Sequence, residues 1–299
     1  MKKSVSMLLA ALMLTGALAG CGSSASTSDS QAADGADGGV SGAITVISRE
    51  DGSGTRGAFI ELTGVEEKTA DGKKVDNTTA DAEIANKTDV VLTSVAGNEK
   101  AIGYISLGAL NDTVKAVKVD GAEATVDNVK AGAYKLSRPF NIATKGEPTG
   151  VAKDFISFIL SKEGQAVVTD NKYIAVNDAA ESFVSDGSSG QIAVGGSSSV
   201  SPVMEKLIEA YKSVNPNASI DLQTSDSTSG MTGAMDGTFA IGMASRELKD
   251  EEAAQLTGTA IALDGIAVIV NPANTIDELS MDQIKSIYIG DITDWGDLA

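Results

Sequence analysis

The sequence contains no histidine and only one cysteine, Cys21, among its 299 residues. Without histidine, the chain cannot build a Ser-His-Asp or Cys-His catalytic arrangement. A zinc site would have to do without imidazole and could use at most one thiolate. We therefore predict that the chain is not an enzyme and that it holds neither a metal nor a cofactor.

Positive charge is also scarce. Lys and Arg together number 23 against 41 Asp and Glu, which gives a net charge of −18. Such a balance argues against nucleic acid as a partner. It would also repel an anionic ligand at long range, so an anion site in this chain must rely on short-range donors that already point at the ligand.

The first residues have the character of an export signal. Lys2 and Lys3 precede an apolar run at residues 5–19, an order that is typical of a signal peptide rather than a membrane-spanning helix. The run ends in LAGC, which resembles the lipobox of bacterial lipoproteins, where the cysteine is lipidated. A cysteine that follows an apolar stretch by chance is the alternative. We expect residues 1–20 to be removed and Cys21 to anchor the mature chain to the cell membrane, on its extracytoplasmic side.

Residues 21–41 are rich in Gly, Ser, Ala and Asp and predict a flexible tether. Residues 42–299 are too many for one hydrophobic core of ordinary size and are enough for two lobes. Here short β-like runs alternate with amphipathic helices, the pattern of an α/β protein. Strands are expected at residues 44–47, 101–105, 114–119, 140–143, 192–194, 220–222, 240–243 and 266–270. Helices are expected after Gly150, after Pro202, and from Met281 with Ser280 as N-cap.

Two turns rich in glycine and hydroxyl groups connect a predicted strand to a predicted helix, at residues 49–56 and 195–199. A third hydroxyl-rich stretch, at residues 224–230, precedes another short helical region. Helix N-termini carry unpaired backbone N–H groups and the positive end of the helix dipole, so each turn is suited to an anion. Taken singly, each turn is equally well explained as an ordinary helix cap.

The sequence resembles a known family in several long strings. ISREDGSGTRGAF, which begins at Ile47, resembles the phosphate-gripping loop of the phosphate-binding lipoproteins of high-affinity phosphate ABC transporters. The other strings are AIGYISLG, LSRPFNIAT, GGSSSVSPVMEKLIEAY, GMASRELKDEE, IALDGIAVIVNP and MDQIKSIYIGDITDW. The resemblance implies a two-lobed, type II periplasmic-binding-protein-like fold with the ligand in the cleft between the lobes.

The order of the strings differs from that in the family, since the half that resembles the family's second part comes first here. We therefore expect a circularly permuted chain, with the family's own termini joined by a linker at residues 182–190. One lobe, which carries the turn at residues 49–55, would comprise residues 42–135 and 269–299. The other, which carries the turns at 197–200 and 227–229, would comprise residues 136–268. A fragment of a longer product, or a chain that swaps elements with a second copy, is the alternative.

The resemblance also assigns the site. The first lobe would supply Arg49 as the charged donor, with Ser53, Gly54 and Thr55, and Asp51 would orient Arg49. The guanidinium suits a tetrahedral oxyanion because its planar fork gives two parallel hydrogen bonds. An exposed pair between Asp51 and Arg56 is the alternative. The facing lobe would supply these groups: Ser199, the amide of Val200, and a hydroxyl from Ser227, Thr228 or Ser229.

Ser245 stands where some family members have an aspartate that accepts the proton of hydrogen phosphate and excludes sulfate. Asp226 could take over that role. The implied ligand is inorganic phosphate, handed to the membrane permease of an ABC importer after the lobes close. The alternatives are another oxyanion such as sulfate, molybdate or arsenate, a phosphate-processing enzyme with a loop serine, and a surface or signalling lipoprotein without transport function.

Overall fold

A computed structural model describes residues 39–298 of the chain. The predicted export signal, Cys21 and the predicted tether up to residue 38 lie outside the described residues. Within residues 39–298, no helix combines the length and apolar character needed to cross a membrane.

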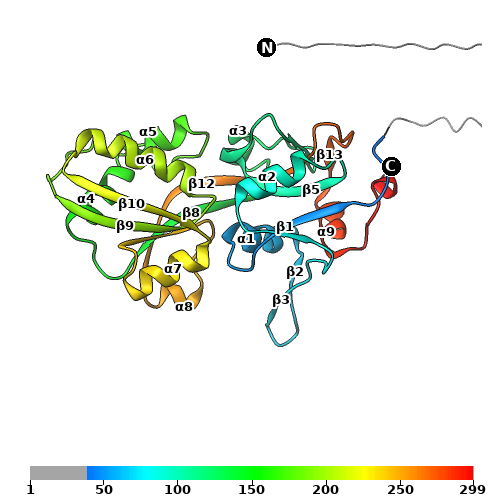
Figure 1. Ribbon diagram of the computed structural model, residues 1–299, viewed down its shortest axis with the longest axis horizontal. Coiled ribbons are helices and arrows are strands. Elements are labelled where there is room, and N and C mark those ends of the chain that lie inside the picture. Colours follow the sequence, from blue (N-terminus) through cyan, green and yellow to red (C-terminus); the bar gives the residue numbers. More distant parts are fainter. Residues whose placement is uncertain (1–38, 299) are drawn as a thin grey trace, which may run out of the picture. The chain divides into compact units, whose positions relative to one another are not determined.

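One large mixed sheet runs through the described part (Figure 1). Its strands lie in the order β10-β9-β11-β8-β12-β5-β1-β4, and the short β6 pairs with β12. Their bounds are β1 (Thr45–Arg49), β4 (Glu83–Ala85), β5 (Ala101–Ser106), β6 (Lys115–Ala116), β8 (Ser137–Thr144), β9 (Gly190–Ser197), β10 (Ala218–Ser225), β11 (Ile241–Ala244) and β12 (Thr257–Val270). Two small pairs stand apart, β2 (Glu66–Lys68) with β3 (Lys74–Asp76) and β7 (Lys118–Val119) with β13 (Glu278–Leu279).

Two large clusters of buried apolar side chains form on this sheet. The first core gathers around β1, β5 and the second half of β12. It is packed by α1 (Gly54–Thr63), α2 (Thr88–Ala96), α3 (Val126–Lys130) and α9 (Met281–Ile289). The second core gathers around β8, β9, β11 and the first half of β12. It is packed by α4 (Gly150–Ile159), α5 (Lys162–Asp170) and α6 (Ser201–Val214). A smaller cluster lies under α7 (Ser227–Asp236) and beside α8 (Asp250–Ala253).

The strands β8 and β12 pair antiparallel in the middle of the sheet and connect the two cores. Ile261 and Ala262 of β12 belong to the second core, whereas Ile266 and the residues after it belong to the first. The fold is therefore a mixed α/β architecture with two cores on a shared sheet. The lobe boundaries at residues 135/136 and 268/269 stay a prediction.

Local sequence signals account for the helix starts. Ser280 caps α9, as predicted, and also forms a capping box with Gln283. Helix α4 begins at Gly150 and α6 at Ser201, with Pro202 in the first turn, where a missing N–H costs nothing.

Asp154 of α4 fixes the predicted linker at residues 182–190 to the second core. The carboxylate accepts hydrogen bonds from the Tyr211 hydroxyl at 2.7 Å, the Ser185 hydroxyl at 2.8 Å, the Asp186 amide at 2.9 Å and the Asn215 amide group at 3.0 Å. Burial raises the pKa of Asp154, but these donors outweigh it and the net pKa lies below its ordinary value. The charged form of Asp154 is therefore built into the fold.

Candidate functional site

The turn after β1 carries five of the predicted site residues, namely Arg49, Asp51, Ser53, Gly54 and Thr55. Strand β1 ends at Arg49, and α1 begins at Gly54 with Ser53 as its N-cap. The Ser53 hydroxyl accepts a hydrogen bond from the Arg56 amide at 3.3 Å. The amides of Gly54 and Thr55 then lie in the first turn of the helix, where no intrahelical partner exists. This is the anion-binding geometry that the sequence predicts.

Arg49 is almost fully buried, with 2 % of its surface exposed. Its Nε and Nη2 bind the two carboxylate oxygens of Glu50 at 2.8 Å each. Nε also donates to the carbonyl of Ala85, and Nη2 donates to the Ser198 hydroxyl at 3.2 Å. Nη1 is buried and has no hydrogen-bond partner within the described part of the chain. A buried guanidinium N–H without a partner is rare and costly, so this donor requires an acceptor.

Two packed aromatic rings hold the backbone at Arg49 in place. The ring of Phe59 stacks on that of Tyr104 at 3.9 Å between centroids. The Tyr104 hydroxyl bonds to that of Ser48 at 2.9 Å and accepts the Arg49 amide at 3.2 Å. Burial raises the pKa of Tyr104 to about 12, so the hydroxyl stays neutral and remains a donor as well as an acceptor.

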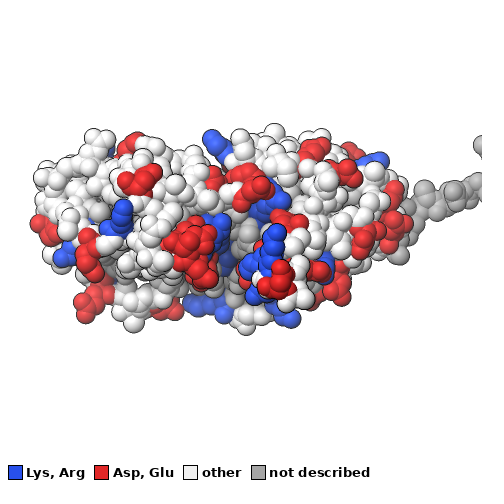
Figure 2. Space-filling view, turned by 90° about the horizontal axis from the view of Figure 1, so that it is seen from below, with Lys and Arg blue, Asp and Glu red and all other residues white. Residues whose placement is uncertain are grey.

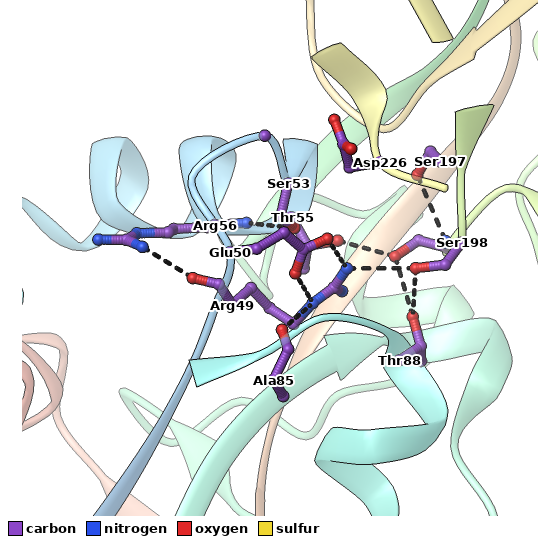
Figure 3. A network of polar contacts seen from close by, with 12 residues as sticks. Arg49, Glu50, Ser53, Thr55, Arg56, Ala85, Thr88, Ser197, Ser198 and Asp226 are labelled. Carbon is purple, nitrogen blue, oxygen red and sulfur yellow. Dashed lines mark hydrogen bonds and ion pairs between the residues drawn. The ribbon is translucent and has the colours of Figure 1, made fainter. Parts of the chain in front are cut away.

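The prediction that Asp51 orients Arg49 is wrong. The Asp51 side chain is 97 % exposed and pairs with Arg56 at 2.7 Å, which is the alternative considered from the sequence. Glu50 holds Arg49 instead. The strand ends at Arg49, and the Glu50 side chain turns back onto the guanidinium (Figure 3). The Asp51 side chain is exposed to solvent instead.

The turn between β9 and α6 (the serine turn, residues 197–200) faces the turn at residues 49–56 (the arginine turn). Ser198 and Ser199 are buried, and the Ser199 hydroxyl lies 2.7 Å from that of Thr55. The prediction that the Val200 amide is free for a ligand is wrong, because it donates to the carbonyl of Ser197 at 3.0 Å and so closes the turn. The hydroxyls, rather than the amides, are therefore what this turn offers.

Thr88 completes a cluster of buried hydroxyls around Arg49. It is the first residue of α2, and its Oγ1 lies 3.5 Å from Ser198 Oγ and 3.4 Å from Ser199 Oγ (Figure 3). Sequence reasoning missed Thr88, Ser198 and Glu50. A strand followed by a hydroxyl residue at a helix start is the signal that could have pointed to Thr88.

The structure distinguishes the three hydroxyls at the start of α7. Thr228 donates through its amide and its hydroxyl to the carbonyl of Gly52, at 3.1 and 3.3 Å. Ser229 donates to Asp226, the N-cap residue, through both its amide and its hydroxyl. Ser227 is fully buried and faces Ser245. Of the three predicted residues, Ser227 therefore points into the site.

Ser245 lies at the end of β11 and accepts the hydroxyl of Ser197 at 2.9 Å. Its amide donates to the Ser227 hydroxyl at 3.1 Å. Asp226, which the sequence offered as a substitute proton acceptor, is bound to Ser229 and lies apart from Arg49 (Figure 3). Ser245, and not Asp226, therefore lies among the buried hydroxyls of Ser197 and Ser227.

Gly54 makes the close approach of the two cores possible. A Cβ atom at this position would lie 2.4 Å from Ser227 Oγ and 2.8 Å from Ser245 Oγ. Both hydroxyls belong to the opposite side of the site. Only glycine allows the N-terminus of α1 to come this near to them.

The arginines around the site are each paired with a carboxylate. Arg49 pairs with Glu50, Arg56 with Asp51 and Asp76, Arg138 with Asp264, and Arg246 with Glu252. Figure 2 shows basic side chains gathered about the middle of one face, directly beside acidic ones. Among the residues that the structure describes, no group of acidic or cysteine side chains could hold a metal ion. An anion would therefore be bound by hydrogen-bond donors within a nearly charge-balanced surrounding.

Comparisons with known proteins identify the family of the chain. A model of the PBP superfamily domain matches residues 22–163 and 182–299. The phosphate-binding protein PstS 2 of Streptococcus agalactiae is 50% identical over 300 residues, which cover 99% of this chain and 98% of that protein. PstS 2 of Streptococcus pneumoniae is 48% identical over 296 residues, 99% of each.

A solved structure extends the likeness to three dimensions. The phosphate-binding protein of a phosphate ABC transporter from Streptococcus pneumoniae superposes with a TM-score of 0.69 at 50% sequence identity. The match covers 86% of this chain and all of that one. The two PstS 2 alignments run through nearly the whole chain, so these relatives carry its segments in the same order. Circular permutation relative to other members stays a prediction. The chain belongs to the PBP superfamily and, within it, to the family of the phosphate-binding proteins PstS 2.

Proposed function

We propose that this chain captures inorganic phosphate between its two cores and delivers it to the membrane permease of an ABC importer. One observation carries the proposal. The buried Arg49 Nη1 has no hydrogen-bond partner among residues 39–298, and the same guanidinium binds Ser198, which belongs to a cluster of buried hydroxyls from three different turns. The PstS 2 relatives are phosphate-binding proteins, which supports the same ligand.

In this proposal the following groups bind the phosphate. Arg49 Nη1 supplies the charged donor, and the α1 N-terminus supplies the amides of Gly54 and Thr55. The hydroxyls come from Ser53 and Thr55 on one side, Ser198, Ser199, Ser227 and Ser245 on the other, and Thr88 beside them. A hydroxyl both donates and accepts, so this lining can meet either a bare or a protonated phosphate oxygen.

Capture would proceed by closure of the two cores about β8 and β12. In the described state the two sides already touch, through the Thr55–Ser199 hydroxyl pair and the bond from the Thr228 amide to the Gly52 carbonyl. The hydroxyls of Thr55 and Ser199 can give up the hydrogen bond between them and bind phosphate oxygens instead. The bond from the Thr228 amide to the Gly52 carbonyl spans the two sides, so it would form on closure and help to define the closed arrangement that a permease would recognise.

In this proposal the protein works outside the cytoplasm and is held at the membrane by a lipid on Cys21. The signal-like residues 1–20 and the LAGC sequence support it. Metabolic labelling with a radioactive fatty acid tests the anchor. Wild-type protein should take up label and a Cys21→Ala variant should not.

Another oxyanion is the second candidate ligand, because Ser245 stands where an aspartate would reject a fully ionised anion. Calorimetric titration of the mature protein with phosphate, sulfate, arsenate and molybdate separates the candidates. Phosphate should bind, and sulfate should not compete equally with it. Equal competition by sulfate would overturn the phosphate assignment. Binding of no oxyanion would favour a surface or signalling role, and hydrolysis of a chromogenic phosphate ester would favour an enzyme.

A further inference from the structure

Arg56, the second arginine of the turn, makes contacts that its sequence position does not suggest. It lies on α1, and its side chain is 14 % exposed. Nη1 donates to the carbonyl oxygen of Arg49 at 2.8 Å and to Asp51 at 2.7 Å. Nε and Nη2 each contact Oδ2 of Asp76 at 2.9 Å. One guanidinium thus joins the arginine turn to the end of β3.

These bonds hold the arginine turn at both of its ends. The Arg56 amide donates to the Ser53 hydroxyl, and the Arg56 side chain donates to the Arg49 carbonyl (Figure 3). The segment between them carries Glu50, which in turn holds the Arg49 guanidinium. The backbone from which Arg49 reaches the site is therefore fixed by a residue whose own side chain points away from the hydroxyl cluster.

Asp76 is the stronger anchor of Arg56. Asp51 is 97 % exposed and Asp76 is 27 % exposed, so solvent screens the first pair far more than the second. Burial raises the pKa of Asp76, but bonds from Thr78 and Arg56 outweigh it and keep the pKa below its ordinary value. Asp76 is the last residue of β3, in the β2–β3 hairpin that projects from the body of the protein (Figure 1).

We propose that Arg56 is a positioning residue for the anion site and that Asp76 holds it in place, so that the β2–β3 hairpin contributes to phosphate affinity without touching the ligand. The proposal rests on the proposed function, because it concerns the same site. A residue that only stabilises the fold would not change phosphate affinity, whereas Arg56 in this proposal affects affinity by holding the backbone of Arg49.

Calorimetry on the full mature protein tests this with four variants. Arg56→Ala should raise the phosphate Kd about tenfold, the equivalent of one lost charge-assisted hydrogen bond. Asp76→Asn should raise it by about threefold, and Arg56→Lys should recover part of the loss. Lys285→Gln is the matched control, because Lys285 pairs with Glu67 of the same hairpin at 2.7 Å and has no contact with the arginine turn. Its Kd should equal that of the wild type.

The combination of Arg56→Ala with Asp76→Asn distinguishes a shared route from two separate effects. If Asp76 acts through Arg56, adding Asp76→Asn to Arg56→Ala should change the Kd no further. A Kd for Arg56→Ala within about twofold of the wild type, with a lowered melting temperature, would reduce Arg56 to a structural residue. Failure of the wild type to bind phosphate would instead refute the proposed function, and the two failures are thus separable.

Discussion

Truncation of Arg49 is the most direct test of the site. In Arg49→Ala the ligand loses the charged donor Nη1, and Ser198 loses the donor that holds its hydroxyl. Glu50 loses both of its bonds to the guanidinium and remains as an unpaired carboxylate beside an anion. These effects act in the same direction.

The magnitude follows from the burial of the group. A charge-assisted hydrogen bond contributes about 1.5–3 kcal/mol, and removing one partner of a buried charge pair costs about 2–5 kcal/mol. We expect Arg49→Ala to weaken phosphate binding by about 2–4 kcal/mol, which is roughly 30-fold to nearly 1,000-fold in Kd. Isothermal titration calorimetry of both proteins in one buffer measures it.

A second variant separates the two contributions. Arg49→Ala combined with Glu50→Gln removes the unpaired carboxylate and should recover part of the lost affinity. If the phosphate Kd of Arg49→Ala lies within about twofold of that of the wild type, Arg49 does not bind the phosphate and the proposed site is wrong. A lower melting temperature of the phosphate-free protein would not by itself count against the site.

Three further predictions concern closure and stability. Gly54→Ala should raise the phosphate Kd by about tenfold or more, because its Cβ would lie 2.4 Å from Ser227 Oγ. Gly57→Ala on the same helix is the control, because its Cβ would have no neighbour closer than 3.8 Å, and it should bind phosphate like the wild type. Equal affinities of the two variants would contradict the close approach at Gly54. Burial raises the pKa of Asp264 to about 6, so its contribution to the free energy of unfolding is full below about pH 4 and is lost as the pH rises through about 6. Urea denaturation of the wild type and of Asp264→Asn measures this contribution as the difference between their free energies of unfolding. The difference should fall as the pH rises from about 4 to about 6. A difference that stays constant would show that the pKa of Asp264 is not raised in the folded protein. Asp154→Asn should lower the free energy of unfolding by about 2–3 kcal/mol near neutral pH and by less in acid, where the wild-type carboxylate is itself protonated; an unchanged denaturation midpoint would contradict this.

Much of the fold follows from local patterns in the sequence. The apolar spacing of α4, α6 and α9, together with the Ser280 cap of α9, predicts these helices with starts close to those in the structure. The sequence predicts a strand at residues 44–47, a small-residue turn at 49–56 and then a helix, and β1 and α1 follow this order, although α1 already begins at Gly54. Periodicity and capping involve residues at most a few positions apart, so the sequence carries them directly.

The partners inside the site depend on the folded chain. Whether Glu50 or Asp51 binds Arg49 depends on the direction in which the chain leaves β1, and composition favours neither. Ser198 reaches Arg49 across 149 positions of sequence. The Val200 amide is consumed by its own turn, a detail that the pattern of small residues does not show.

Residue types at short and regular spacing are sufficient to predict the α/β class, the family and the two turns of the candidate site. The hydroxyls that gather around Arg49, the carboxylate that holds it and the bond of Arg56 to Asp76 are seen only in the folded chain. The physical reason is range: a hydrogen bond forms or fails within a few tenths of an ångström, and segments far apart in sequence reach that precision only when both cores are packed.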